Sequence, residues 1–142
     1  MTDPFNLQRF IDAQATVYAG VLDELRAGRK ATHWMWFIFP QLKELGRSAI
    51  ARHYGISSLA EAAAYLEHPV LGQRLLECTG LMLATRGRTA LEILGSPDEL
   101  KFRSCMTLFR AARPELRVWQ AALDRYYGGK TDATTLALLL KQ

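Results

Sequence analysis

Apolar residues in this chain recur at three- and four-residue steps, the spacing that lines them up along one side of an α-helix. The first such stripe is preceded by Asp3, a suitable N-cap, with Pro4 at the first helical position, and Gly28 is a suitable stop. Its apolar members are Leu7, Phe10, Ile11, Val17, Tyr18, Val21, Leu22 and Leu25. No pair of candidate partner strands is evident in the chain, so the spacing favours helices throughout.

Start and stop signals for further helices follow along the rest of the chain. They predict helices at residues 48–54, 59–66, 69–86, 97–113, 114–127 and 132–140, and a short helix or turn at residues 91–94. The clearest start is Ser96-Pro97-Asp98-Glu99, which combines an N-cap, a first-turn proline and a glutamate three residues after the cap. Gly72 and Gly80 are expected to allow close contact between helices. The sequence therefore predicts an all-α fold, a compact single domain over residues 1–142 with about seven to nine helices, several of them short.

The segment from Trp34 to Phe39 is continuously apolar and fits either a buried strand or a short buried helix. With no partner strand in view, we favour a helix. Pro40 disfavours helical geometry at the residue before it and is expected to end the element.

Composition excludes several classes of protein. Hydrophobic residues make up 49% and charged residues 23% of the 142 residues, which argues against disorder. No apolar run approaches the length of about 18 residues that spans a bilayer, and no secretory signal is recognisable, so we expect a cytoplasmic protein without membrane contact. Cys78 and Cys105 are expected to be reduced and buried. The net charge of +4 allows weak attraction to anions without requiring it.

Four stretches of the chain carry a family resemblance. They are Lys30–Gln41 (KATHWMWFIFPQ), Leu66–Leu75, Ser96–Lys101 and Ser104–Phe109. Together they resemble a bacterial family known as domain of unknown function 1810, over nearly the whole chain. The resemblance implies a multihelical fold with no established activity. Some relatives carry a calpastatin label, but nothing in this sequence resembles a protease-inhibitor repeat.

The aromatic segment is the first candidate for a binding site. Trp34 and Trp36 either fill the core or, for one of them, form the wall of a pocket. Lys30, His33 and Gln41 flank them with a cation, an imidazole and an amide. An aromatic wall with polar groups at its rim suits a nucleotide-like or other planar ligand.

The predicted helix after Pro97 supplies the second candidate. At 100° per residue, Asp98 and Lys101 fall in or beside the sector of the apolar residues, whereas four other residues fall opposite, toward solvent. Those four are Glu99, Arg103, Thr107 and Arg110. Asp98 and Lys101 either pair with each other at i,i+3 or face an anionic or hydroxyl-bearing ligand. Ser104 on the same helix is a further candidate ligand-binding residue.

His68 and Arg74 complete the candidate set. His68 is either a helix cap or a ligand-binding imidazole, and Arg74 is placed to meet a carboxylate or phosphate. The three histidines share no zinc-like spacing with each other or with the cysteines, so no metal and no cofactor are predicted. Catalytic residues cannot be named, because nucleophile-elbow and phosphate-loop patterns are both missing.

Three functions compete at this point. The favoured one is binding of an anionic or nucleotide-like small molecule in a tryptophan-lined pocket, with hydrolase or transferase activity as an open extension. The second is a non-catalytic interaction module or homodimer, suggested by the leucines at 138–140. The third, weak nucleic-acid binding, would use Arg103, Arg110, Arg113 and Arg117, but Glu99 and Glu115 dilute that face and no reader motif accompanies it.

Overall fold

The computed structural model describes residues 2–142, which form ten α-helices and one short 3-10 helix, with no strand among them. The all-α prediction is therefore confirmed. In chain order the helices are α1 (Gln8–Ala15), α2 (Tyr18–Ala27), α3 (Met35–Ile38), the 3-10 helix η1 (Lys43–Leu45), α4 (Ala49–His53), α5 (Leu59–Glu67), α6 (Leu71–Ala84), α7 (Ala90–Leu94), α8 (Asp98–Ala112), α9 (Val118–Tyr127) and α10 (Ala133–Leu140).

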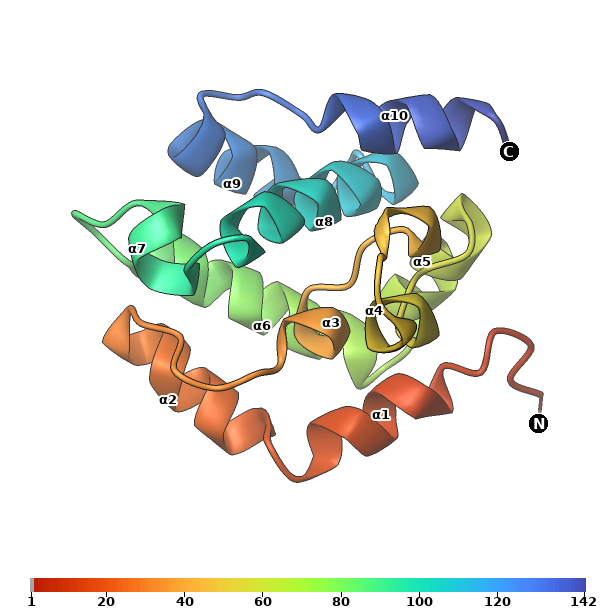
Figure 1. The fold of residues 1–142 in the computed structure, drawn as a ribbon, viewed down its shortest axis with the longest axis horizontal. Helices are drawn as coiled ribbons and strands as arrows, with labels where there is room; N and C mark the ends of the chain where they lie inside the picture. The colour runs from red at the N-terminus through yellow and green to blue at the C-terminus, as the bar shows by residue number, and fades with distance from the viewer. Residues whose placement is uncertain (1) are drawn as a thin grey trace.

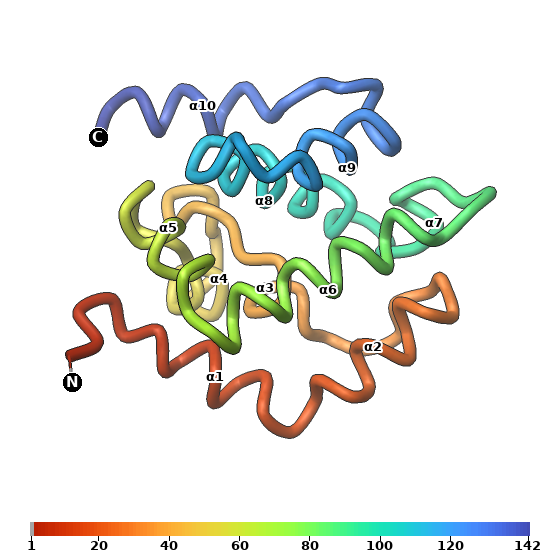
Figure 2. The backbone as a smooth tube through the Cα atoms, turned by 180° about the vertical axis from the view of Figure 1, so that it is seen from behind, coloured from red at the N-terminus to blue at the C-terminus, as the bar shows by residue number. Residues whose placement is uncertain are grey.

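The helices are stacked in tiers with α8 near the middle. Helices α1 and α2 form the lower edge in Figure 1, α6 and α3 lie above them, and α8 and α9 lead up to α10 at the upper edge. Figure 2 shows the same order from behind, with α6 crossing between α2 and α9. Helix α8 packs against α5, α7, α9 and α10. Residues from nearly every element thus meet in one hydrophobic core.

The first predicted helix is divided in two. The helical stripe from Leu7 to Leu25 breaks at Thr16 and Val17, so that α1 and α2 turn around the core at an angle (Figure 1). No proline or glycine marks the break; two adjacent β-branched residues, which are weak helix formers, occupy it. This division explains why the structure has more helices than predicted.

Several helix ends follow their sequence signals, but the expected start at Asp3 and Pro4 is wrong, because α1 begins at Gln8. Gly28 ends α2 with φ of 72°, a left-handed conformation that favours glycine, and the hydroxyl of Ser58 accepts a hydrogen bond from the Glu61 amide at the start of α5. The expected cap at Ser96 is wrong: the residue before α8 is Pro97, and no side chain caps this helix. Ser96 lies one residue before the N-cap position, next to Gly95, whose φ of 79° lies in the left-handed region.

The aromatic segment is helical, as favoured. Helix α3 ends at Phe39, whose φ of −121° and ψ of 72° lie outside the helical region, directly before Pro40. The two cysteines, Cys78 and Cys105, are free and buried as predicted. Burial raises the pKa of both thiols, so neither is primed as a nucleophile.

Helix α8 is buried on more sides than the periodicity predicts. Phe102, Cys105 and Phe109 lie in the core as expected, but Thr107, predicted to face solvent, is also fully buried. The segment before α10 covers it: the Thr107 hydroxyl donates to the carbonyl of Arg103 at 2.8 Å and accepts from the Asp132 amide at 2.9 Å. A polar residue that satisfies its hydrogen bonds internally can occupy such a position.

The segment from Gln41 to Ile56 forms a closed loop that carries η1 and α4. Its ends are joined by two backbone hydrogen bonds, from the Lys43 amide to the Ile56 carbonyl and from the Ile56 amide to the Gln41 carbonyl, both 2.9 Å long. Gly55 permits this approach, because a Cβ there would lie 2.4 Å from the Cα of Lys43. This segment, which we call the 41–56 loop, lies opposite the N-terminal half of α8.

Two glycines of α6 should respond oppositely to alanine. A Cβ on Gly72 would lie 2.1 Å from the carbonyl oxygen of Leu66, whereas a Cβ on Gly80 would have no neighbour within 4 Å. The expected close contact thus exists only at Gly72. We expect Gly72→Ala to lower the free energy of unfolding by about 1–3 kcal/mol and Gly80→Ala to raise it by about 0.5–1 kcal/mol. Urea denaturation of the two variants measures both, and a stabilised Gly72→Ala protein would contradict the packing.

Candidate ligand-binding site

Glu24 holds the loop that leads from α2 into α3. Its carboxylate accepts hydrogen bonds from the amides of Ala31 and Thr32 at 2.6 and 2.9 Å, from the Thr32 hydroxyl at 2.6 Å and from Nε1 of Trp34 at 3.0 Å. Burial alone would raise the pKa of Glu24, but these donors outweigh burial and lower the pKa to about 2. An ionised Glu24 therefore fixes the segment that carries the aromatic candidates.

This network predicts a pH-dependent difference between the protein and its Glu24→Gln variant. Because the pKa in the folded state lies below the ordinary value of 4.5, the carboxylate contributes fully above about pH 4.5 and loses its contribution as the pH falls toward 2. Glu24→Gln should cost about 1–3 kcal/mol near pH 7. Urea denaturation as a function of pH should show this difference shrinking on acidification, and Glu44→Gln, at an exposed residue of η1, is the control for a surface substitution and should cost little near pH 7.

Lys30 and Lys101 share one carboxylate at the start of α8. Nζ of Lys30 lies 3.0 Å from Oδ2 of Asp98, and Nζ of Lys101 lies 3.7 Å from Oδ1. The Lys30 side chain is only 8% exposed, whereas that of Lys101 is 25% exposed. The negative charge of Asp98 is therefore paired more closely with Lys30. The three groups together carry one excess positive charge, and it lies on the more accessible Lys101.

The two tryptophans of the aromatic segment have different places. Trp34 is 1% exposed and belongs to the core, where its indole meets Phe39. Trp36 is half-buried. Nζ of Lys30 lies 5.1 Å from the ring centre of Trp34 and Nζ of Lys101 lies 5.5 Å from that of Trp36, both within cation–π range. Trp36 is thus the indole that a ligand can reach.

A cavity of about 410 Å³ lies between this segment and the start of α8. Six of the predicted residues line it, and the exposed His33 stands at its rim. The six are Lys30, His33, Trp34, Trp36, Asp98 and Lys101. We call this space the tryptophan cavity. Its size falls within the usual range for small-molecule sites.

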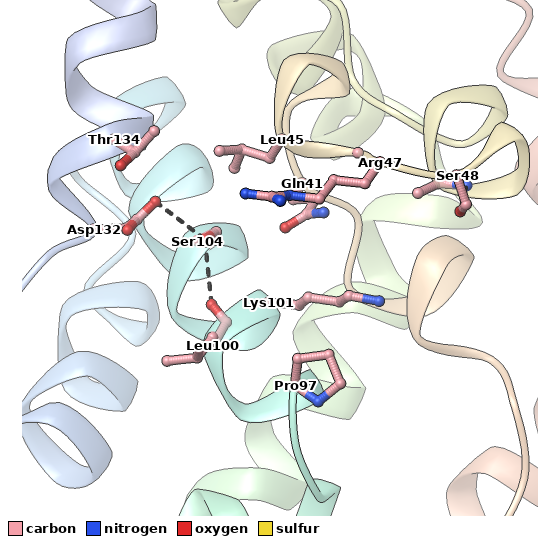
Figure 3. A pocket seen from close by; sticks show the side chains of 12 residues that line it. Gln41, Leu45, Arg47, Ser48, Pro97, Leu100, Lys101, Ser104, Asp132 and Thr134 are labelled. Atoms are coloured by element: carbon pink, nitrogen blue, oxygen red, sulfur yellow. Dashed lines mark hydrogen bonds between the residues drawn. The ribbon is translucent and has the colours of Figure 1, made fainter.

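A second cavity, of about 510 Å³, lies between the 41–56 loop and α8 (Figure 3). Gln41 and Ser104 line it, and Pro97 and Lys101 line both cavities. Sequence reasoning missed Arg47, which points into this space from the loop (Figure 3). No periodic pattern marks a residue between short helices, so only the tertiary structure reveals it. We call this space the loop cavity.

Comparison with known proteins gives the chain a family. The family model described as "Protein of unknown function (DUF1810)" matches residues 4–139. The chain belongs to the DUF1810 family. It is also similar to a solved structure, the crystal structure of the conserved hypothetical protein Rv1873 from Mycobacterium tuberculosis, with 57% identity over 97% of this chain and 99% of that one and a TM-score of 0.96. The comparison with curated proteins finds no match.

In this DUF1810 protein, two predicted site residues lie away from both cavities. Nδ1 of His68 accepts hydrogen bonds from the amides of Val70 and Leu71 at 3.1 and 3.3 Å, so this imidazole serves the start of α6. The Arg74 guanidinium stacks on Tyr18, 4.5 Å from its ring centre, and donates to Oε1 of Gln14 at 3.2 Å. Neither residue lines the tryptophan cavity or the loop cavity.

Ser104 lines the loop cavity, but its hydroxyl is engaged within the protein. It lies 3.2 Å from the carbonyl oxygen of Leu100 and 3.1 Å from Oδ2 of Asp132, as the dashed lines in Figure 3 show. Asp132 in turn caps α10 by accepting from the Thr135 amide at 3.1 Å. This arrangement ties α8 to α10 and places no imidazole beside the serine.

Two of the four arginines considered for a basic face are held by the protein itself. The Arg103 guanidinium donates to the carbonyls of Lys130 and Thr131 at 3.0 and 2.7 Å, and Arg113 pairs with Glu67 at 2.5 Å. Over residues 2–142, no group of three or more histidine, cysteine or acidic side chains is placed to hold a metal ion. Among the helices described, none is both long enough and apolar enough to cross a membrane.

Proposed function

We propose that the tryptophan cavity binds an anionic small molecule with a planar part, such as a nucleotide. The observation that carries this proposal is the position of Lys101. Its ammonium group lies 3.7 Å from a carboxylate that Lys30 already balances at 3.0 Å, and 5.5 Å from the ring centre of the half-buried Trp36. A cation beside an accessible indole offers one contact for a negative charge and one for a flat ring.

The surroundings of Lys101 support an anion in particular. Lys30 and Lys101 face a single carboxylate, so an incoming anion would complete the charge balance without displacing Asp98. The 8% exposure of the Lys30 side chain lowers the screening of its charge by water. The exposed His33 at the rim adds a ring nitrogen that can form a hydrogen bond with a ligand. The same geometry names no nucleophile, so the proposal is one of binding.

The test compares a nucleotide with its uncharged parent. By isothermal titration calorimetry, AMP should bind the protein and adenosine should bind at least about tenfold more weakly, because a charge-assisted contact contributes about 1.5–3 kcal/mol. Lys101→Met should weaken AMP at least about tenfold and leave adenosine nearly unchanged. Lys141→Met, at an exposed lysine that lines neither cavity, is the matched control.

Two results would overturn the proposal. One is that neither AMP nor a simple aryl phosphate binds at millimolar concentration. The other is that AMP binds equally well to the Lys101→Met and Lys141→Met proteins, which would place the anion elsewhere. Raised salt should weaken a genuine interaction with Lys101, since screening acts on partly exposed charges.

One observation favours the second candidate function, a homodimer or interaction module. Leu140 on α10 is 88% exposed, the highest value among the large exposed hydrophobic side chains of the described residues. A single exposed leucine is common on monomers, however. Sedimentation at high concentration tests this second function, since a protein that sediments as a monomer would exclude the homodimer hypothesis.

A further inference from the structure

The two cavities adjoin, and Lys101 stands between them. Pro97 and Lys101 line both spaces. The charged end of Lys101 belongs to the tryptophan cavity, because Nζ lies near Asp98 and Trp36, which both line that cavity. Its aliphatic stem borders the loop cavity. Figure 3 shows the side chain extending along this cavity with its nitrogen pointing away from Ser104. One side chain therefore presents a charge to one space and methylene groups to the other.

The loop cavity offers apolar surface beside this charge. Leu45, Ala51, Pro97 and Leu100 line it. Leu100 is 56% exposed although it stands on α8, whose other large apolar residues are buried. An apolar group that entered the space would cover the exposed part of Leu100 and the half-buried Leu45, and burial of such surface is favourable.

The part of the loop cavity that lies away from Pro97 carries polar groups beside Leu45 (Figure 3), which favours a short apolar group over a long one. Arg47, Gln41 and Thr134 lie there with Asp132. Ser104 and Asp132 are already hydrogen-bonded to each other at 3.1 Å, so they offer little to a ligand. The lining of the space thus changes from the apolar Pro97 and Leu100 near Lys101 to a mixture of polar groups and Leu45 (Figure 3).

We propose that the ligand is an amphipathic anion, with its charged group on Lys101 in the tryptophan cavity and a short alkyl or aryl group in the loop cavity. This inference rests on the proposed function, since it uses the same lysine. It adds a substrate class: organic phosphates or carboxylates that carry an apolar arm are preferred over equally charged ligands that lack one.

The experiment uses methyl, propyl and butyl phosphate, which share one headgroup and differ in the length of the apolar arm. Each methylene group buried should tighten binding roughly two- to fourfold, so butyl phosphate should bind at least about tenfold more tightly than methyl phosphate by calorimetry. The Leu100→Ala protein should lose part of this gain and the Leu45→Ala/Leu100→Ala protein most of it. Leu91→Ala, at an α7 leucine that is 54% exposed and lines neither cavity, should retain the gain.

The possible outcomes separate the two proposals. If the three phosphates bind equally and Lys101→Met weakens all of them, the amphipathic class is overturned and the anion site stands. If the gain with arm length survives in the double variant, the arm lies outside the loop cavity and the inference fails. If neither AMP nor any alkyl phosphate binds, the proposed function and the inference fail together. Leu100→Ala removes an exposed side chain, so a loss of binding there cannot be attributed to unfolding.

Discussion

Replacing Glu61 by alanine is expected to lower the free energy of unfolding by about 3–5 kcal/mol, the range for breaking a buried ion pair. The side chains of Glu61 and Arg9 are 3% and 10% exposed, and their charged groups lie 2.8 Å apart. The second carboxylate oxygen accepts from the amide and the hydroxyl of Ser57 at 2.9 and 2.7 Å. The same guanidinium also donates to the carbonyls of His53 and Gly55. Loss of Glu61 leaves a desolvated cation that joins α1 to the end of the 41–56 loop.

Urea denaturation followed by circular dichroism measures the effect. Glu67→Ala is the matched control, because Glu67 also pairs with an arginine, Arg113, but its side chain is 67% exposed. Exposed pairs contribute about 0–1 kcal/mol, so this variant should stay close to the parent protein. A loss of less than about 1 kcal/mol for Glu61→Ala would show that water compensates Arg9 and that the pair is not a structural anchor.

Replacing Trp34 by alanine should also cost about 3–5 kcal/mol, the range for truncating a buried aromatic side chain. Trp34 is 1% exposed, packs against Phe39 and donates from Nε1 to Glu24 at 3.0 Å. Its removal leaves a cavity in the core and takes one donor from the carboxylate that holds the loop before α3. Trp34→Phe should cost less, since it keeps most of the apolar volume and loses only the hydrogen bond.

Trp36→Ala is the comparison that gives the Trp34 result its meaning. Trp36 is half-buried, so its loss should destabilise the fold by well under half as much as that of Trp34. Chemical denaturation of both variants measures the difference. Equal losses would show that Trp36 is a structural residue like Trp34, which would weaken the case for an accessible indole in the tryptophan cavity.

Helix positions could be predicted from the sequence because their signals are local. Gly28, Ser58 and Asp132 act at the ends of α2, α5 and α10 through conformations and hydrogen bonds that involve only neighbouring residues. The break at Thr16 could not be predicted, because weak helix formers end a helix only where packing against the core favours a turn. The burial of Thr107 was missed for a related reason: the segment before α10, which is distant in sequence, covers this side of α8.

The candidate site was predicted in part. Lys30 and Trp36 were chosen as candidates from one short segment and Lys101 from another, but only the packing of α8 against the segment before α3 shows that the three line one cavity. Arg47 depends on how the 41–56 loop lies against α8, which no periodicity encodes. His68 was considered because it precedes a predicted helix, and of its two interpretations the structure agrees with the helix cap, since Nδ1 accepts hydrogen bonds at the start of α6.

The closed 41–56 loop gives the loop cavity two walls of unequal stability. One wall is α8, which packs against four other helices and is therefore expected to be among the last parts of the protein to open. The other wall is the 41–56 loop, whose two ends are joined by two backbone hydrogen bonds. Gly55 allows those ends to approach each other closely. Local opening where these ends meet would widen the cavity while α8 keeps its place, so we expect the loop, rather than α8, to set how large a group can enter.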